Sequence, residues 1–266
     1  MRYGCCLSMV AEGPDKTGRE FIHEAARIGY DYIELPLSGL GSLSEDEFYE
    51  VRKQMKDAGI TCEACNNFFP AGMSLVGPRR REEEILEYTE LVLGRAERLG
   101  AEYVGLGSGV SRNVPEGVAL DEGYRQLTGL LRQLGRIAKR KGITILIEPL
   151  RREESNLIHT LTEARQLAED TGSGNVKILV DYYHFCAEKE SAAHITAQST
   201  DMLRHVHFAR PDNRYYPTGE AHCSYEEFFH ALKSIGYDSR ISFEAYANNF
   251  SRDAEEALGL IKASVG

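Results

Sequence analysis

The sequence predicts an α/β protein with a (β/α)8 barrel, the TIM-barrel architecture, in a single domain over residues 1–266. Short apolar runs alternate with amphipathic segments along the whole chain. Five of the amphipathic segments end in a glycine directly before an apolar run, and no Pro-rich, Gly/Ser-rich or low-complexity linker interrupts the pattern. Strict alternation favours parallel strands joined by right-handed crossovers. Eight such units in 266 residues fit a closed barrel better than an open doubly wound sheet.

Each apolar run is interpreted as a strand that is buried on both faces. The expected strands cover 2–10, 31–35, 60–65, 102–106, 143–148, 176–181, 203–208 and 240–244. The expected helices cover about 16–28, 44–58, 79–99, 118–141, 159–170, 188–199, 224–235 and 251–264. The third helix is the best marked, because Pro78 precedes it, Leu and Val recur at helical spacing, and Gly100 follows it. Glycine between helix and strand recurs in RIGYDYIEL, KDAGITCEA, RLGAEYVGL, RKGITILIE and SIGYDSRISFE.

The charge of the chain limits its partners. Lys and Arg number 31, Asp and Glu number 41, and the net charge is −10. A protein that grips phosphate backbones needs a basic surface, so we expect no nucleic acid partner. No apolar run approaches the ~20 residues that span a bilayer, and the apolar part of the N-terminus is too short for a signal peptide. We therefore expect a cytoplasmic protein with a small-molecule substrate, and the sequence is compatible with a homo-oligomer.

The cysteines do not form a strong metal or redox motif. Of the six, Cys62 and Cys65 are spaced as C-x-x-C, and a zinc ribbon would need a second such pair. The surrounding ITCEAC looks like a strand, in which positions three apart face opposite ways. We therefore expect free thiols in a reducing compartment.

Polar residues end the last four strands, where a TIM barrel places its active site. Strand 143–148 ends in Glu148, strand 176–181 in Asp181 and strand 240–244 in Glu244, while strand 203–208 contains His205 and His207. Each acidic residue alone would be an ordinary helix cap or loop residue. Four suitable groups on successive strand ends instead predict one divalent metal ion, with Mn²⁺ preferred and Co²⁺ or Mg²⁺ as alternatives.

The two histidines are two residues apart and share a face of their strand. His207 lies nearer the barrel mouth, so we choose it as the metal ligand. His205 is then expected to pack beside it in the interior.

The segments IEPLRREESNLIHT, VDYYHF, HVHFARPDNR and ISFEAY, supported by GLGSGVSRNVPEG, resemble the sugar phosphate isomerases/epimerases of the xylose-isomerase-like barrels. Within them, the sequence is most similar to the ketose 3-epimerases of the D-tagatose/D-psicose type. The resemblance implies that the metal ligands are Glu148, Asp181, His207 and Glu244, and that Glu148 and Glu244 also act as the acid/base pair.

The same resemblance implies that Glu154, His184 and Arg214 bind the sugar substrate. Each has an ordinary alternative: Glu154 as a solvated loop charge, His184 as a helix cap, and Arg214 as a surface residue. The spacing from His207 to Arg214 is one residue longer than in the epimerase pattern, so Arg210 is an alternative to Arg214. Two loops, 107–117 and 66–72, are expected to shape the pocket, the second with an apolar wall.

These features predict a metal-dependent epimerase that acts at C3 of a ketose through an enediolate. A divalent ion would stabilise the negative charge, and one carboxylate would remove a proton that another returns to the opposite face. An aldose–ketose isomerase, or a dehydratase or lyase acting on a sugar or an inosose-type cyclitol, could use the same site. A metal-dependent nuclease and a non-catalytic partner subunit are further alternatives.

Overall fold

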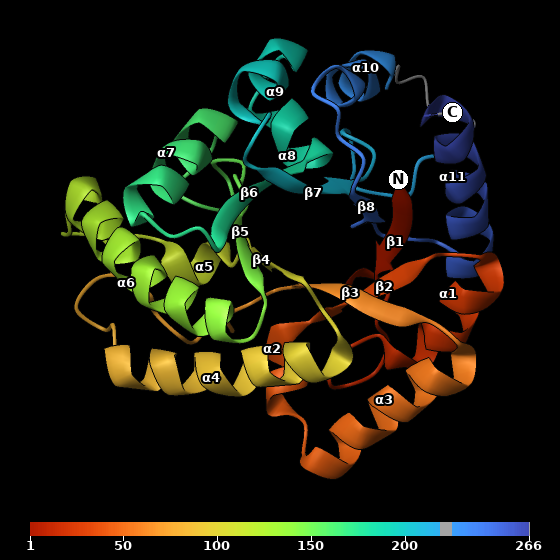
Figure 1. The fold of residues 1–266 in the computed structure, drawn as a ribbon, viewed down its shortest axis with the longest axis horizontal. Coiled ribbons are helices and arrows are strands. Elements are labelled where there is room, and N and C mark those ends of the chain that lie inside the picture. The colour runs from red at the N-terminus through yellow and green to blue at the C-terminus, as the bar shows by residue number, and fades with distance from the viewer. Residues whose placement is uncertain (219–224, 266) are drawn as a thin grey trace.

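Eight parallel strands close into a barrel in the order β1 to β8, with helices around the outside (Figure 1). The computed structural model describes residues 1–218 and 225–265. The strands are β1 Arg2–Cys6, β2 Tyr32–Pro36, β3 Thr61–Asn66, β4 Tyr103–Leu106, β5 Thr144–Ile147, β6 Val176–Asp181, β7 Leu203–Phe208 and β8 Arg240–Phe243. β1 pairs with β8 as well as with β2, which closes the ring. The predicted (β/α)8 TIM barrel is therefore confirmed.

Helices follow the strands and cover the outer face of the barrel (Figure 1). The α-helices are α1 Ile22–Ile28, α2 Leu37–Ser42, α3 Glu45–Ala58, α4 Glu82–Leu99, α5 Gly109–Arg112, α6 Leu120–Arg140, α7 Leu161–Thr171, α8 Tyr182–Ala187, α9 Ala192–Gln198, α10 Glu226–Ser234 and α11 Phe250–Val265. The 3₁₀ helices are η1 Leu7–Met9 and η2 Arg19–Phe21. In these described residues, no helix has the length and apolar character needed to cross a membrane.

Several predicted boundaries were wrong. The first strand was expected to reach residue 10, but it ends at Cys6 because the chain turns into η1. The helix expected over 188–199 is restricted to α9, and a separate helix, α8, directly follows β6. α8 begins there because the Asp181 side chain accepts a hydrogen bond from the backbone N–H of Tyr183. Cys223 and the first residue of the helix expected over 224–235 lie outside the described residues.

Cys62 and Cys65 are free thiols, as predicted, but the expected direction of their side chains was wrong. Cys62 and Cys65 do not face opposite ways, because their Sγ atoms are 3.9 Å apart and both residues are buried. The pairing of β2 with β3 shifts between Ile33 and Glu34, so Glu63 is an extra residue in β3. Such a bulge breaks the period of two that the prediction assumed.

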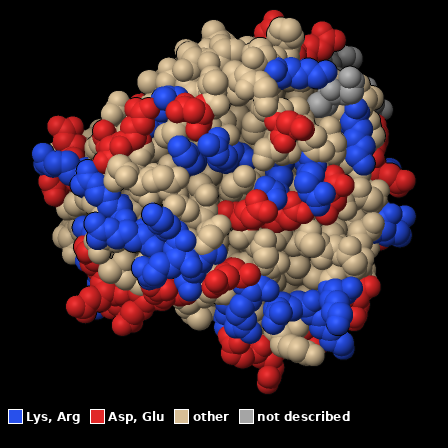
Figure 2. All heavy atoms as spheres, in the orientation of Figure 1, with Lys and Arg blue, Asp and Glu red and all other residues tan. Residues whose placement is uncertain are grey.

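Ion pairs tie the strand starts together at one end of the barrel. Glu63 contacts Arg2 at 2.5 Å and Arg240 at 2.6 Å, and Arg240 also contacts Glu102 at 3.1 Å. β1 begins on the face that Figures 1 and 2 present, where acidic and basic side chains gather over the middle of the barrel. The strands run away from this face, so their carboxyl ends, with the predicted site residues, lie at the opposite mouth.

Candidate functional site

Four side chains from the ends of four neighbouring strands converge at that mouth. Glu148 directly follows β5, Asp181 ends β6, His207 lies in β7 and Glu244 directly follows β8. One possible ligand atom from each of the four lies within 4.8 Å of those of the others, and all four residues are buried. His207 Nδ1 is 3.3 Å from Glu148 Oε1 and 3.2 Å from Glu244 Oε2. The structure therefore brings together the four predicted metal ligands.

The chemistry of this donor set fits a divalent cation. Carboxylate oxygens and an imidazole nitrogen suit Mn²⁺, Mg²⁺ or Co²⁺. Asp181 uses Oδ1 to cap α8 at 2.8 Å from the Tyr183 nitrogen and directs Oδ2 into the cluster, where it is 3.1 Å from Arg214 Nη2. Asp181 can thus cap α8 with one oxygen and contribute the other oxygen to the site.

The electrostatics of the cluster show the cost of gathering carboxylates. Burial raises the pKa of Glu148, and the Glu244 carboxylate raises it further. Burial also raises the pKa of Asp181 to about 7, although Arg214 opposes the rise. Burial acts the same way on Glu244, but the charges of His207 and Arg214 outweigh it and hold the pKa of Glu244 well below its usual range. A bound dication would offset the repulsion among these buried carboxylates and favour their ionised forms.

A glycine makes room for Glu148. Gly107 follows β4, and a Cβ atom at that position would lie 2.4 Å from Glu148 Oε2. The absence of a side chain at the first residue of the Gly-rich segment 107–117 therefore leaves Glu148 in its position, because a Cβ there would force the end of the Glu148 side chain to shift.

Arg214 enters the site, although the spacing from His207 is one residue longer than in the epimerase pattern. Its Nη2 is 2.6 Å from Glu244 Oε2, and its backbone is left-handed, with φ of 62°. This conformation is unusual for a residue other than glycine. The alternative, Arg210, forms two hydrogen bonds with Asp212, at 3.0 and 2.8 Å. The structure therefore favours Arg214 over Arg210.

His184 offers a hydrogen-bond donor to the pocket. Its Nδ1 accepts from the backbone N–H of Arg151 at 3.4 Å, so the proton of the neutral ring is on Nε2. Burial and, to a smaller extent, the charge of Arg214 lower the pKa of His184 to about 2, so the ring is neutral. Nε2 is buried and has no hydrogen-bond partner among the described residues.

Glu154 also reaches the pocket. Its Oε1 pairs with Arg151 at 2.8 Å, and its Oε2 is 3.8 Å from Arg214. It is about one-third exposed, so it is both a loop charge and a residue of the cavity wall.

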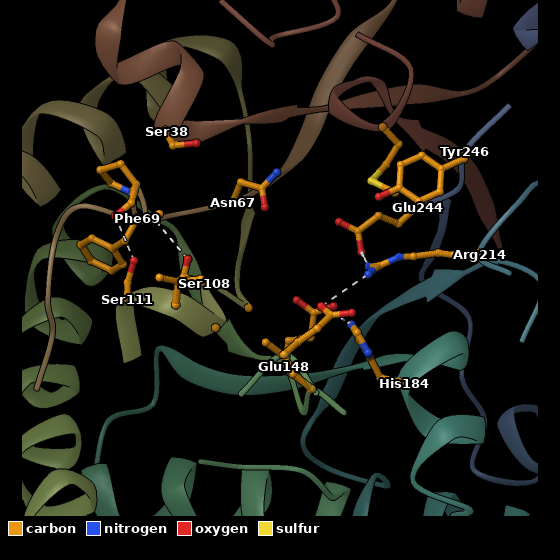
Figure 3. Close-up of a pocket in the computed structure, with 18 residues that line it drawn as sticks. Ser38, Asn67, Phe69, Ser108, Ser111, Glu148, His184, Arg214, Glu244 and Tyr246 are labelled. Carbon is orange, nitrogen blue, oxygen red and sulfur yellow. Dashed lines mark hydrogen bonds and ion pairs between the residues drawn. The ribbon is translucent and has the colours of Figure 1, made fainter. Parts of the chain in front are cut away.

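These groups line one cavity of about 340 Å³. In Figure 3, Glu148, His184, Arg214 and Glu244 gather on one side, while Phe69, Ser108 and Ser111 lie on the other. Ser108 lies between β4 and α5, Ser111 lies in α5, and Phe69 comes from the loop after β3. Both loops therefore shape the pocket, and Phe69, Pro70 and Ala71 give the wall an apolar part.

Two buried polar residues near the cluster were missed in the sequence. Asn66 ends β3 and donates from Nδ2 to Glu244 Oε1 at 2.9 Å. Glu34 lies in β2 beneath His207 and contacts His205 as well. A signal was available for both, because Asn66 ends a strand and Glu34 interrupts the apolar run YIELP. His205 packs behind His207, with ring centroids 5.0 Å apart.

Comparisons with known proteins agree with this geometry. A 3-dehydro-D-guloside 4-epimerase of Escherichia coli (strain K12) is 26% identical over 223 residues, which are 82% of this chain and 82% of that protein. An L-ribulose 3-epimerase of Methylomonas sp. (strain DH-1) is 28% identical over 236 residues, 86% of this chain and 79% of that protein. A D-psicose 3-epimerase of Clostridium cellulolyticum H10, solved with D-tagatose, superposes with a TM-score of 0.84 at 20% identity, covering 100% of this chain and 99% of that one.

The family model described as "Xylose isomerase-like TIM barrel" matches residues 22–264, nearly the whole chain. This match includes strands β2 to β8 and each of the four clustered residues. The resemblance seen in the sequence is therefore confirmed, and the chain belongs to the xylose isomerase-like TIM barrel family.

Proposed function

We propose that this protein is a divalent-metal-dependent epimerase that inverts C3 of a ketose. The observation that carries the proposal is the placement of Glu148 and Glu244, two carboxylates from β5 and β8 that line one cavity beside the candidate metal ligands. A proton on the carbon next to a carbonyl can be removed to give an enediolate, and inversion requires its return from the opposite face. Two carboxylates in one cavity supply an acceptor and a donor for that proton.

The names of the relatives support the same chemistry. A 3-epimerase acting on L-ribulose inverts the carbon beside the C2 carbonyl, and a 4-epimerase acting on a 3-dehydro sugar inverts the carbon beside the C3 carbonyl. Both reactions move a proton on the carbon next to a ketone.

The other polar residues would hold and orient the sugar. Glu148, Asp181, His207 and Glu244 would bind one ion, Mn²⁺ being our first choice, which when bound supplies a Lewis acid that polarises the carbonyl. His184 would donate its free Nε2–H to a substrate oxygen. Arg214 and Glu154, on the wall of the same cavity, would bind hydroxyl groups.

The charge of the cavity favours a sugar without a phosphate group. Among the described residues that line it, Arg214 is the sole Lys or Arg, and Glu244 and Asp181 already neutralise that guanidinium. A phosphate away from the metal would meet the carboxylate of Glu154 and no unpaired Lys or Arg of the described cavity wall.

A second candidate is epimerisation of a keto sugar that carries a substituent, at the carbon beside its ketone. Val110 and Tyr246 line the cavity and are exposed, at 66% and 47%. Exposed apolar groups at the mouth could contact the substituent of a glycoside, and the E. coli relative is named for a dehydro-guloside.

The test is solvent exchange. Mn²⁺-loaded protein is incubated in deuterated water with free ketoses, ketose phosphates, 3-keto-glycosides and inososes, and products are identified by NMR and mass spectrometry. We expect deuterium at C3 of a free ketose, with formation of its C3 epimer. Exchange restricted to C1 or C2 would indicate an aldose–ketose isomerase, and loss of water a dehydratase. Absence of exchange with every sugar would overturn the proposal.

A further inference from the structure

Glu34 is a carboxylate in the middle of a fully buried strand. Every residue of β2 is buried, and the relative exposure of Glu34 is 0%. An ionised carboxylate in such a place is costly unless its oxygens are hydrogen-bonded or paired. Both oxygens of Glu34 have a partner: Oε1 contacts His205 Nε2, and Oε2 is 3.2 Å from His207 Nε2.

The contact with His207 determines which nitrogen of that ring carries the proton. His207 Nδ1 faces Glu148 and Glu244, whereas Nε2 faces Glu34. An imidazole that binds a cation through one nitrogen must keep its proton on the other. An ionised carboxylate only accepts hydrogen bonds, so Glu34 accepts from Nε2–H, and Glu148 and Glu244 accept from Nδ1–H when the ring is charged. An ion in the cluster would displace the Nδ1 proton, while Glu34 retains the proton on Nε2.

We propose that Glu34 is the positioning residue of the metal site, which holds His207 with its proton on Nε2 so that Nδ1 binds the ion. The inference rests on the metal-binding part of the proposed function. Carboxylates behind a ligating histidine fix the ring's orientation and tautomer in other metalloproteins, and their loss typically weakens metal binding about 10–100-fold.

His205 fixes Glu34 in turn. The rings of His205 and His207 are nearly perpendicular, at 87°, and each directs Nε2 to a different oxygen of the same carboxylate. Glu34 is thus held from two sides and cannot rotate without losing a hydrogen bond. This explains why two histidines share one face of β7, although His207 alone reaches the cluster.

The same residues suggest a competing interpretation. Possible ligand atoms of Cys6, Glu34 and His207 lie within 4.8 Å of one another, so a second ion could be imagined between them. Such an ion would need the Nε2 position of His207 and the Glu34 oxygens, which the two histidines already engage. We therefore expect one ion per chain, which elemental analysis measures.

The test replaces Glu34 by glutamine. The amide in Glu34→Gln has one accepting oxygen for two N–H donors, and its NH₂ group favours a His207 ring with the proton on Nδ1. We expect the dissociation constant for Co²⁺, measured by titration of the visible absorption, to rise about 10–100-fold. The matched control is Glu63→Gln, which removes a carboxylate from the far end of the barrel and should leave Co²⁺ affinity unchanged.

A double variant tests the shared carboxylate. Replacing His205 by phenylalanine in Glu34→Gln removes the second donor, so the amide oxygen can turn toward His207 Nε2. Co²⁺ affinity should return toward that of the wild type. An affinity no better than that of the single variant would contradict the arrangement, as would wild-type affinity in Glu34→Gln itself.

One measurement uses the wild-type protein and therefore does not depend on whether a Glu34 variant folds. In the Mg²⁺-loaded wild type, two-bond ¹H–¹⁵N spectra, with His207 assigned through His207→Asn, should show the proton on Nε2. A proton on Nδ1, or two ions per chain, would overturn the proposal. Normal Co²⁺ binding with this tautomer, but without exchange on any sugar, would contradict the epimerase and leave the role of Glu34 intact.

Discussion

Asn66 at the end of β3 donates a 2.9 Å hydrogen bond to Oε1 of Glu244, although 178 residues separate them in the chain. The other oxygen of Glu244 faces Arg214 and His207, at 2.6 and 3.2 Å. The two oxygens therefore have different surroundings, and Asn66 restrains the carboxylate in one orientation.

Asn66→Ala should lower kcat/KM for the exchanged sugar, because a hydrogen bond to a charged group contributes about 1.5–3 kcal/mol, which corresponds to about 10–150-fold. Asn66→Asp keeps the size of the side chain but sets a carboxylate against Glu244, so we expect a larger loss. Initial rates of epimerisation with saturating metal measure both. Equal activity of Asn66→Asp and the wild type would exclude a role for this contact.

Glu148→Gln and Glu244→Gln should both abolish net epimerisation, with losses of about 10²–10⁴-fold. Each variant retains one carboxylate, which can still remove a proton from one face and return deuterium to it. We therefore expect each variant to exchange deuterium with one epimer, and the two variants to prefer opposite epimers. Co²⁺ titrations run in parallel separate loss of metal from loss of proton transfer. Wild-type turnover of metal-loaded Glu244→Gln would rule out its assigned role.

His184→Phe should weaken catalysis without weakening metal binding. The change removes the Nε2–H that points into the cavity and replaces it with an apolar ring, so we expect kcat/KM to fall about 10-fold or more. Co²⁺ affinity should stay within a few-fold of the wild type, because His184 is not among the four clustered residues. His184→Gln retains a donor and should recover part of the activity. A large loss of Co²⁺ affinity in His184→Phe would instead indicate a place in the metal site.

Three of the clustered residues share one feature of the sequence. Glu148, Asp181 and Glu244 each follow a buried apolar strand, and the barrel brings all its strand ends to one mouth. This rule depends on the order of strands and helices and not on detailed geometry, so the sequence is sufficient to predict that these residues meet at one mouth. Asn66 ends β3 in the same way, so the same rule places it at this mouth.

Other features depend on geometry that periodicity does not encode. The C-x-x-C cysteines come together because of a bulge at Glu63, and a regular strand would have separated them. All residues of β2 are buried, so the pattern of the strand does not show which side the Glu34 side chain faces. Its partners can be known only once β2 and β7 are placed in the barrel. A charged residue inside an apolar strand nonetheless indicates that a buried partner exists.

Asp253 provides a test of stability against pH that is separate from the site. Its carboxylate accepts from the backbone N–H groups of Asn248 and Asn249, at 2.9 and 3.0 Å, at the start of α11. Burial acts to raise the pKa of Asp253, but the hydrogen bond from Asn249 and the charge of Arg252 outweigh it, so the pKa is lowered. The Asp253 carboxylate therefore makes its full contribution to the free energy of unfolding above its pKa in the unfolded chain, about 3.9. This contribution is lost as the pH falls through its pKa in the folded protein.

Asp253→Asn should lower the free energy of unfolding at pH 7 by about 1 kcal/mol, a usual value for a weakened helix cap. The difference between wild type and variant should shrink as the pH falls below about 4, because the carboxyl of the unfolded wild-type chain then takes up a proton, and the folded carboxyl follows at lower pH. Urea unfolding followed by circular dichroism between pH 7 and 3 measures this difference. A difference that stays constant over the range would show that the charge of Asp253 does not contribute.

Gly107→Ala should damage the metal site while leaving the barrel intact. The added methyl group would lie 2.4 Å from Glu148 Oε2, closer than non-bonded atoms approach, so the end of the Glu148 side chain must shift. We expect weaker Co²⁺ binding and an even larger loss of exchange, since Glu148 also serves in proton transfer. The control is Gly259→Ala in α11, where nothing lies within 4 Å of the added Cβ and the unfolding free energy should rise by up to about 1 kcal/mol. Because both variants add the same methyl group, a Gly107→Ala protein with wild-type Co²⁺ affinity and exchange rate would show that Glu148 avoids the methyl group without leaving the cluster, and would contradict the role assigned to Gly107.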